Sequence, residues 1–353
     1  MEQQAVSQNK IPFEFHGKAG EYFGIWIVNI LLTIITVGIY SAWAKVRTNR
    51  YFYGQTVLNN ANFAYLADPI AILKGWLIAI VILIIYSVSS SFIPPLELAF
   101  FLLLIIAMPF LVVKSMRFRT RNSAWQNIRF TFNGKYGEAF RVFIIWGFLA
   151  VILSLGLLVP YAQYRMKKFL IENSSYGQSE FEFKANASDF YIVYLIAFGL
   201  FTLFFLLLVA AGAGVGFIAQ ANAAEPQPVP PQFGLAQVII MPLTLLFYLF
   251  AFAYMQSRIG NITWGNINIQ GNRLESSLRA RDLTWIYFTN LLGIMLSFGL
   301  LVPWAKVRTM RYRMSKLEMQ STGNLDQFIQ AEQSKVSALG EEIGDVFDLD
   351  IGI

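Results

Sequence analysis

Seven long apolar runs divide this sequence, and they restrict its fold more than any other feature does. They cover residues 22–40, 70–88, 96–113, 140–159, 190–218, 235–254 and 283–302. A helix crosses the hydrocarbon core of a bilayer with about 20 apolar residues, and every run reaches or approaches that length. Charged residues make up 14% of the chain, against about 25% in a soluble domain. The pattern therefore predicts a polytopic α-helical membrane protein.

Three of the runs end in one repeated motif, which we call the A motif. A glycine is followed by an aromatic residue, an alanine and further polar or basic residues, at the same spacing in the first, fourth and seventh runs. The outer copies contain Gly38, Trp43, Lys45, Arg47 and Arg50, and Gly299, Trp304, Lys306, Arg308 and Arg311, while the middle copy contains Gly156, Tyr161, Gln163, Arg165 and Lys168. We call these three runs A segments. The other four runs form two helical hairpins, the B units, so that the order is A-B-A-B-A.

Short stretches of alternating apolar residues occur between these units. They lie at 13–15, 63–65, 130–132, 181–183 and 267–269, and several are followed closely by a glycine. Such alternation before a glycine predicts a β-strand and a turn. An acidic residue then falls near the start of the next apolar run, where it suits the helix dipole.

Lysine and arginine residues are concentrated at the flanks of the units and in the links between them. These regions hold 26 of the 27, and Lys74 is the other one. Because such residues mark the cytoplasmic side, A segments that enter and return on one side would place all 26 inside. We predict two transmembrane helical hairpins plus three repeated re-entrant or spanning segments, four to seven spans in all, with short cytoplasmic β-strands. Seven simple spans remain the alternative.

The chain is expected to divide into two parts of different character. Residues 1–320 would form the membrane-embedded repeat unit, and residues 321–353 an acidic cytoplasmic tail. We expect this tail to be solvated, with docking onto a partner as the alternative.

The residue types that most reactions need are scarce. The chain has no cysteine and a single histidine, His16, which excludes thiolate chemistry and makes a histidine-based metal site improbable. The common hydrolase and NTPase motifs do not occur. We therefore expect no enzyme activity and no cofactor or metal. Asn29 and Asn290 are the deepest polar positions and suit interhelical hydrogen bonds or a polar path, whereas Lys74 can extend to the membrane surface.

The basic and aromatic residues of the A motifs allow two interpretations. They anchor the segments at the membrane boundary, or they bind the headgroups of anionic lipids. The candidate contacts are Trp43, Lys45, Arg47, Arg50, Arg165, Trp304, Lys306, Arg308 and Arg311. Nucleic acid is not expected as a partner, because the bilayer already accounts for these residues.

The run FEFHGKAGEYFGIWIVNILLTIITVGIYSAWAKVRTNRYFYG, at residues 13–54, closely resembles the N-terminal region of the YjgN family of bacterial inner-membrane proteins. The resemblance implies a multi-pass protein of the inner membrane and supplies no catalytic residues. Because members of that family are often encoded near a zinc metallopeptidase, it also suggests a metallopeptidase as a membrane-protein partner.

Two functions follow as hypotheses. The first is a non-enzymatic module that binds membrane phospholipids or scaffolds a membrane partner, as the repeated basic and aromatic motif indicates. The alternative is a transporter or channel for a small or amphipathic substrate, because internal repeats and broken segments are typical of transporters. The absence of charged residues from the middle of the apolar runs argues against the alternative.

Overall fold

The computed structural model describes residues 9–92, 95–221, 232–321, 323 and 325–348. Within these residues, eleven strands form one antiparallel sheet in the order β7-β6-β5-β4-β3-β2-β1-β11-β10-β9-β8. The strands are β1 (Asn9–Phe15), β2 (Thr56–Leu58), β3 (Ala61–Tyr65), β4 (Ser123–Trp125), β5 (Ile128–Phe132), β6 (Ser174–Tyr176), β7 (Ser179–Glu180), β8 (Glu182–Phe183), β9 (Ile267–Ile269), β10 (Asn272–Ser276) and β11 (Leu317–Ser321).

The sheet closes on itself. Its two outermost strands, β7 and β8, are consecutive pieces of chain separated by Phe181 alone, and they pair with β6 and β9 respectively. On the other side of the ring, β1 pairs with β11, so that Asn9 lies opposite Ser321. Closure leaves no long unpaired strand edge. We call this closed sheet the strand ring.

Tight turns connect the strands at one end of the ring. Asn59 and Asn60 both have positive φ, at 47° and 58°, and Gln126 and Asn127 have φ of 51° and 63°. Two central residues with positive φ define the type I′ turn that favours asparagine and matches the twist of a hairpin. The chain leaves the opposite end of the ring as helices.

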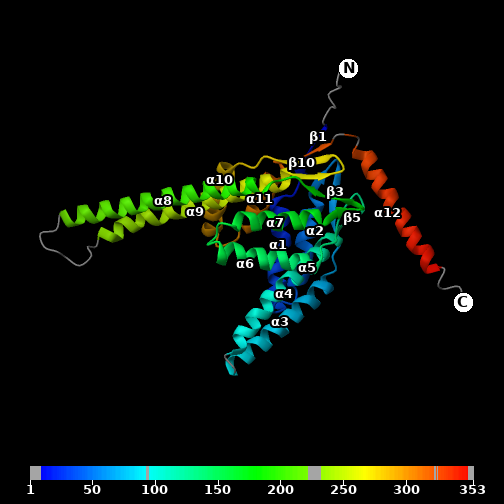
Figure 1. The fold of residues 1–353 in the computed structure, drawn as a ribbon, viewed down its shortest axis with the longest axis horizontal. Helices are drawn as coiled ribbons and strands as arrows, with labels where there is room; N and C mark the ends of the chain where they lie inside the picture. The colour runs from blue at the N-terminus through cyan, green and yellow to red at the C-terminus, as the bar shows by residue number, and fades with distance from the viewer. Residues whose placement is uncertain (1–8, 93–94, 222–231, 322, 324, 349–353) are drawn as a thin grey trace, which may run out of the picture.

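Every helical excursion before the last helix leaves the ring and returns to it. The helices are α1 (Ala19–Ile35), α2 (Ser41–Gly54), α3 (Pro69–Phe92), α4 (Pro95–Arg121), α5 (Tyr136–Phe140), α6 (Trp146–Phe148), α7 (Val159–Glu172), α8 (Ala187–Ala221), α9 (Gln232–Gly265), α10 (Ala280–Leu296), α11 (Val302–Met314) and α12 (Leu325–Asp348), with π-helical turns at Arg141–Ile145 and Leu149–Leu153. The B units α3/α4 and α8/α9 project far from the ring, whereas α12 lies on its other side (Figure 1).

Each A segment is a short helical hairpin. The chain reverses at Gly38, Gly156 and Gly299, with φ of 90°, 91° and 90°. Residues other than glycine rarely adopt this backbone conformation. The reversal leaves α1 and α10 at 17 residues each.

Five helical segments among the described residues are long and apolar enough to cross a membrane. They are Pro69–Val88, Glu97–Arg121, Tyr136–Leu153, Ala187–Ala211 and Ile240–Gly265. The prediction of a polytopic α-helical membrane protein is therefore confirmed, and the number falls within the expected four to seven.

The turn end of the ring is filled by apolar side chains from the strands and from α12. Trp125, Tyr176 and Phe13 are buried there together with Leu325 and Ile329 of α12. Burying one such aliphatic side chain stabilises a fold by about 1.5 to 3 kcal/mol. The first turns of α12 therefore belong to the core of the ring.

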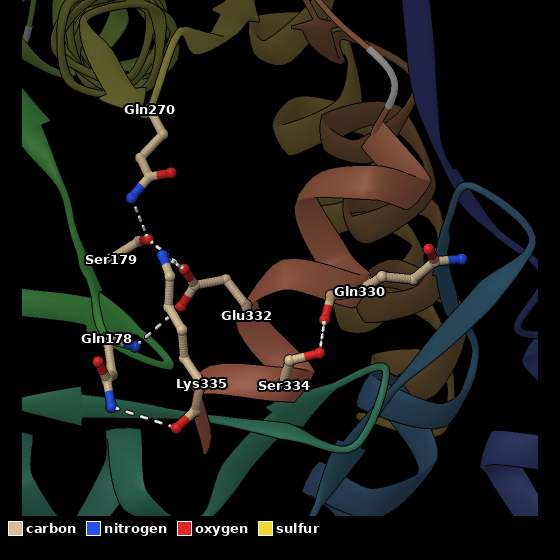
Figure 2. A network of polar contacts seen from close by, with 7 residues as sticks. All are labelled: Gln178, Ser179, Gln270, Gln330, Glu332, Ser334 and Lys335. Carbon is tan, nitrogen blue, oxygen red and sulfur yellow. Dashed lines mark hydrogen bonds and ion pairs between the residues drawn. The ribbon is translucent and has the colours of Figure 1, made fainter. Parts of the chain in front are cut away.

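Glu332 holds the middle of α12 against the ring, as Figure 2 shows. Its side chain has no exposed surface. The carboxylate accepts hydrogen bonds from the backbone N–H of Gln178 at 3.0 Å, from the Ser179 hydroxyl at 2.7 Å and from Lys335 Nζ at 2.7 Å. Burial opposes ionisation most strongly, but these hydrogen bonds together outweigh it and lower the pKa of Glu332.

The proposed boundary between residues 320 and 321 falls inside a structured region. Ser321 is the last residue of β11 and pairs with β1, and Leu325 and Ile329 are buried in the core. The expectation of a solvated tail is therefore wrong for the first part of α12. The reason is an apolar stripe at helical spacing, which packs into the turn end of the ring.

Candidate functional site

A groove opens where the first and last A segments meet. It has a volume of about 410 Å³ and lies between α1, α2 and α11. Trp26, Ile30 and Ile34 supply apolar walls, while Lys45 and Lys306 bring two cationic side chains from A segments at opposite ends of the sequence. We call it the seam groove. It combines an apolar lining with positive charge, as the headgroup region of an anionic lipid requires.

The seam groove exists because the ring closes there. The strands β1 and β11 pair with each other, and this pairing brings α1 and α11 into contact. On α1, the lining residues Tyr22, Trp26, Asn29 and Thr33 recur every three or four positions and therefore share one face of the helix. Tyr22, Trp26 and Thr33 lie outside the A motif, and this helical spacing is the sequence signal that identifies them.

Asn29 connects the two helices of the first A segment. Its Nδ2 donates to the Ala44 carbonyl at 3.3 Å and to the Thr48 hydroxyl at 3.4 Å. Asn290 makes the equivalent contacts in the last A segment, to the Ala305 carbonyl at 3.3 Å and to Thr309 at 3.1 Å. In the structure both asparagines make interhelical hydrogen bonds.

Arg308 is engaged inside the last A segment. Its Nη1 donates to the Thr289 hydroxyl at 2.5 Å and to Asn290 Oδ1 at 3.2 Å, and its guanidinium lies 5.0 Å from the ring centre of Trp304. Arg47 is its counterpart in the first A segment. It is exposed and has no hydrogen bond or ion pair within the part of the chain that the structure describes.

Arg50 and Arg311 hold the ends of strands in place. Arg50 Nη2 donates to the Ala67 carbonyl at 3.2 Å, and Arg311 Nη2 donates to the Gly17 carbonyl at 2.9 Å. Arg117, at the end of α4, makes the same kind of contact to Gly134 at 2.9 Å. These two A-motif arginines do not line the seam groove, and their observed role is to fix the chain between a strand and the next helix.

The other predicted contacts are dispersed. Trp43 stacks on Tyr40 with ring centres 6.2 Å apart and does not line the seam groove. Arg165 lies on α7, in the A segment where Gln163 replaces the groove lysine. Lys74 is exposed near the start of α3. Of the nine predicted lipid contacts, the structure brings Lys45 and Lys306 together at the seam groove, alongside the predicted polar position Asn29.

The tips of the A segments are strongly apolar and exposed. Val37 is 87% exposed, Leu155 91% and Phe298 97%. Exposed apolar side chains of this size at three hairpin tips indicate a lipid environment. The seam groove therefore lies between hairpins whose tips suit the membrane and whose bases join the strand ring.

A second hollow, of about 750 Å³, differs in character. It is lined by Lys135, Gly137, Glu138, Arg141 and Asn173. Its carboxylate offsets part of the positive charge, and none of these lining residues has a hydrophobic side chain. Among the described residues, no group of three His, Cys, Asp or Glu side chains could hold a metal ion.

Residues 10–346 match the family of bacterial proteins of unknown function called DUF898. The chain belongs to the DUF898 family. Its curated relatives include the inner membrane protein YjgN of Salmonella typhimurium, 41% identical over 122 residues, which are 33% of this chain and 30% of that protein. YjgN of Escherichia coli is 29% identical over 159 residues, 44% of this chain and 39% of the relative. These matches cover less than half of either relative.

The family assignment agrees with the resemblance noted in the sequence. Together with the apolar helices, it identifies a multi-pass protein of the bacterial inner membrane. The DUF898 description specifies no function. No solved structure matches this fold.

Proposed function

We propose that this DUF898 protein is a non-enzymatic membrane module that binds the headgroup of an anionic phospholipid in the seam groove. One observation carries the proposal: Lys45 and Lys306 converge on a single groove with apolar walls. Each basic group near an anionic surface contributes about 1 kcal/mol, so two acting together favour an anionic headgroup over a neutral one. The neighbouring apolar surface suits the acyl chains.

We also propose that the strand ring lies in the cytoplasm, with the B units crossing the membrane and the A segments re-entering from the inside. The outer surface of the ring is charged, with exposed Lys10 paired to Glu275 and Glu318 at 3.3 and 3.9 Å. Such a surface requires water. The concentration of basic residues near the ring favours the cytoplasmic side.

Cysteine labelling tests this topology. Because the chain has no native cysteine, an introduced cysteine is the single thiol of the protein that can react. A cysteine replacing Asn60 or Asn127, in two turns of the ring, should react with a membrane-impermeant maleimide only after the inner membrane is opened. A cysteine at 227, between the helices of the second B unit, should react in intact spheroplasts. Labelling of position 60 or 127 in intact spheroplasts would place the ring outside.

Removing the groove charges should reduce lipid binding. The double variant Lys45→Gln, Lys306→Gln should lower the affinity for anionic lipid by about tenfold or more, since two charge contacts of about 1 kcal/mol each are lost. Native mass spectrometry of the purified protein in nanodiscs measures this as bound phosphatidylglycerol against phosphatidylcholine.

Lys74→Gln is the matched control, because Lys74 is an exposed lysine on a B unit and does not line the groove. It should leave anionic lipid binding unchanged. Equal retention of anionic lipid by the double variant and by the wild type would refute the groove as the site. A partner protein, such as a metallopeptidase, is compatible with a lipid-bound scaffold and is tested separately by crosslinking in membranes.

A further inference from the structure

The two equivalent asparagines of the outer A segments differ in one respect. Each donates from Nδ2 to a carbonyl and a threonine hydroxyl of the returning helix. This fixes the orientation of the amide, because a carbonyl oxygen can only accept. Asn290 Oδ1 then accepts from Arg308. Asn29 Oδ1 is buried and has no hydrogen-bond partner among the described residues, although Asn29 lines the seam groove.

A single side chain explains this difference. Arg308 is held over Asn290 by the neighbouring hydroxyl of Thr289. The position that corresponds to Thr289 in the first A segment is Val28, which cannot hydrogen-bond a guanidinium. Arg47 therefore lacks this anchor and is exposed. A buried acceptor without a donor is costly, so a ligand N–H or O–H group that reached Asn29 Oδ1 from the groove would be stabilised.

We propose that the seam groove selects a phosphoglycerol headgroup, with its phosphate at Lys45 and Lys306 and a glycerol hydroxyl donating to Asn29 Oδ1. This proposal rests on the proposed function and names the ligand class of the same site. Arg308 shows that a donor can reach this point in the equivalent hairpin, at 3.2 Å from Asn290 Oδ1.

The groove favours a hydroxyl over an ammonium as the donor. Among the described residues that line it, none is acidic, and two are lysines. An ammonium would be repelled by Lys45 and Lys306 and would find no carboxylate to balance its charge. A neutral hydroxyl forms the hydrogen bond without this repulsion.

The test compares two lipids of equal charge. Phosphatidylglycerol carries hydroxyls beyond its phosphate, whereas phosphatidylmethanol carries none. Native mass spectrometry of the full chain in nanodiscs should show about a threefold to tenfold preference for phosphatidylglycerol, the effect of one neutral hydrogen bond. Soluble glycerol 3-phosphate at millimolar concentration should not displace the lipid, because it lacks acyl chains for the apolar walls.

The variant Val28→Thr is designed to supply the missing anchor. With a hydroxyl at position 28, Arg47 should turn onto Asn29 Oδ1 as Arg308 does onto Asn290, and the preference for phosphatidylglycerol should disappear. Binding of phosphatidylmethanol should stay within about twofold of the wild type, because both lysines remain. Val28→Ala is the matched control at the same position and should keep the preference.

The outcomes separate the two proposals. Equal binding of both lipids by the wild type, or an unchanged preference in Val28→Thr, overturns the phosphoglycerol assignment and leaves anionic lipid binding in place. If neither phosphatidylglycerol nor phosphatidylmethanol binds more strongly than phosphatidylcholine, the proposed function is overturned as well. Displacement by glycerol 3-phosphate would show that the occupant is a soluble phosphoester and not a lipid.

Discussion

Replacing Glu332 with alanine is expected to release α12 from the turn end of the strand ring. The substitution leaves the Gln178 amide and the Ser179 hydroxyl without their acceptor and should destabilise the docked helix by about 3 kcal/mol. Hydrogen–deuterium exchange should therefore be about a hundredfold faster at residues 325–337 and at the Gln178 amide. The measurement uses the full chain in nanodiscs.

Two further variants show whether the buried carboxylate is responsible. Lys335→Ala removes the ion-pair partner of Glu332, a lysine whose side chain is 44% exposed. Because water weakens an ion pair at an exposed lysine, exchange of the α12 amides should change by less than about tenfold. Glu332→Gln keeps an acceptor but loses the charge, and should fall between the two. Wild-type exchange rates in Glu332→Ala would contradict the role of this contact.

The lowered pKa of Glu332 gives the same contact a defined pH dependence. Because the pKa is depressed in the folded protein, the stabilisation is fully present above its ordinary value of 4.5 and is lost as the pH falls through the folded pKa. The protection of α12 amides in the wild type, relative to their intrinsic exchange rate at each pH, should thus fall only in acid. Glu332→Gln should show much less of this loss of protection.

Replacing Gly134 with alanine is expected to destabilise the base of the middle A segment. A Cβ at this position would lie 2.6 Å from the ring of Phe132 and 2.8 Å from that of Phe169. Both rings are buried, at 4% and 2% exposure, so neither can move without disturbing its neighbours. Overpacking of this kind costs about 2 kcal/mol, and the midpoint of thermal unfolding in detergent should fall.

Gly137→Ala provides the matched control, three residues further along the chain. Its added Cβ would meet nothing within 4 Å, and alanine favours the helix α5 in which it lies. This variant should unfold at the wild-type temperature or slightly above. Equal midpoints for the two variants would show that the packing around Phe132 and Phe169 is loose.

Part of the candidate site was predictable from the sequence. The A motif selected Lys45 and Lys306, and depth in the apolar run selected Asn29, all of which line the seam groove. The same motif also selected Arg50 and Arg311, which donate to backbone carbonyls instead. Sequence spacing identifies a basic residue at a membrane boundary, but it does not show which acceptor lies nearest in space.

The strand motif at 267–269 illustrates a similar limit. Its glycine, Gly271, follows alternating apolar residues just as Gly17 and Gly134 do, and those two lie between a strand and the following helix. In the structure Gly271 belongs to the turn between β9 and β10, with φ of 84°. Alternating apolar residues occur in both strands of a hairpin, and glycine serves both kinds of turn, so the local pattern cannot distinguish them.

The sequence by itself determined the features that depend on neighbouring residues. Apolar runs of sufficient length specify the helices, and the glycines at 38, 156 and 299 permit the chain reversals at positive φ. Only the tertiary structure decided which distant residues come together. Asn9 pairs with Ser321, Ser179 donates a hydrogen bond to Glu332, and Lys45 and Lys306 line the same groove. The physical reason is that ring closure joins residues far apart in the chain, through side-chain packing and strand register that no local periodicity encodes.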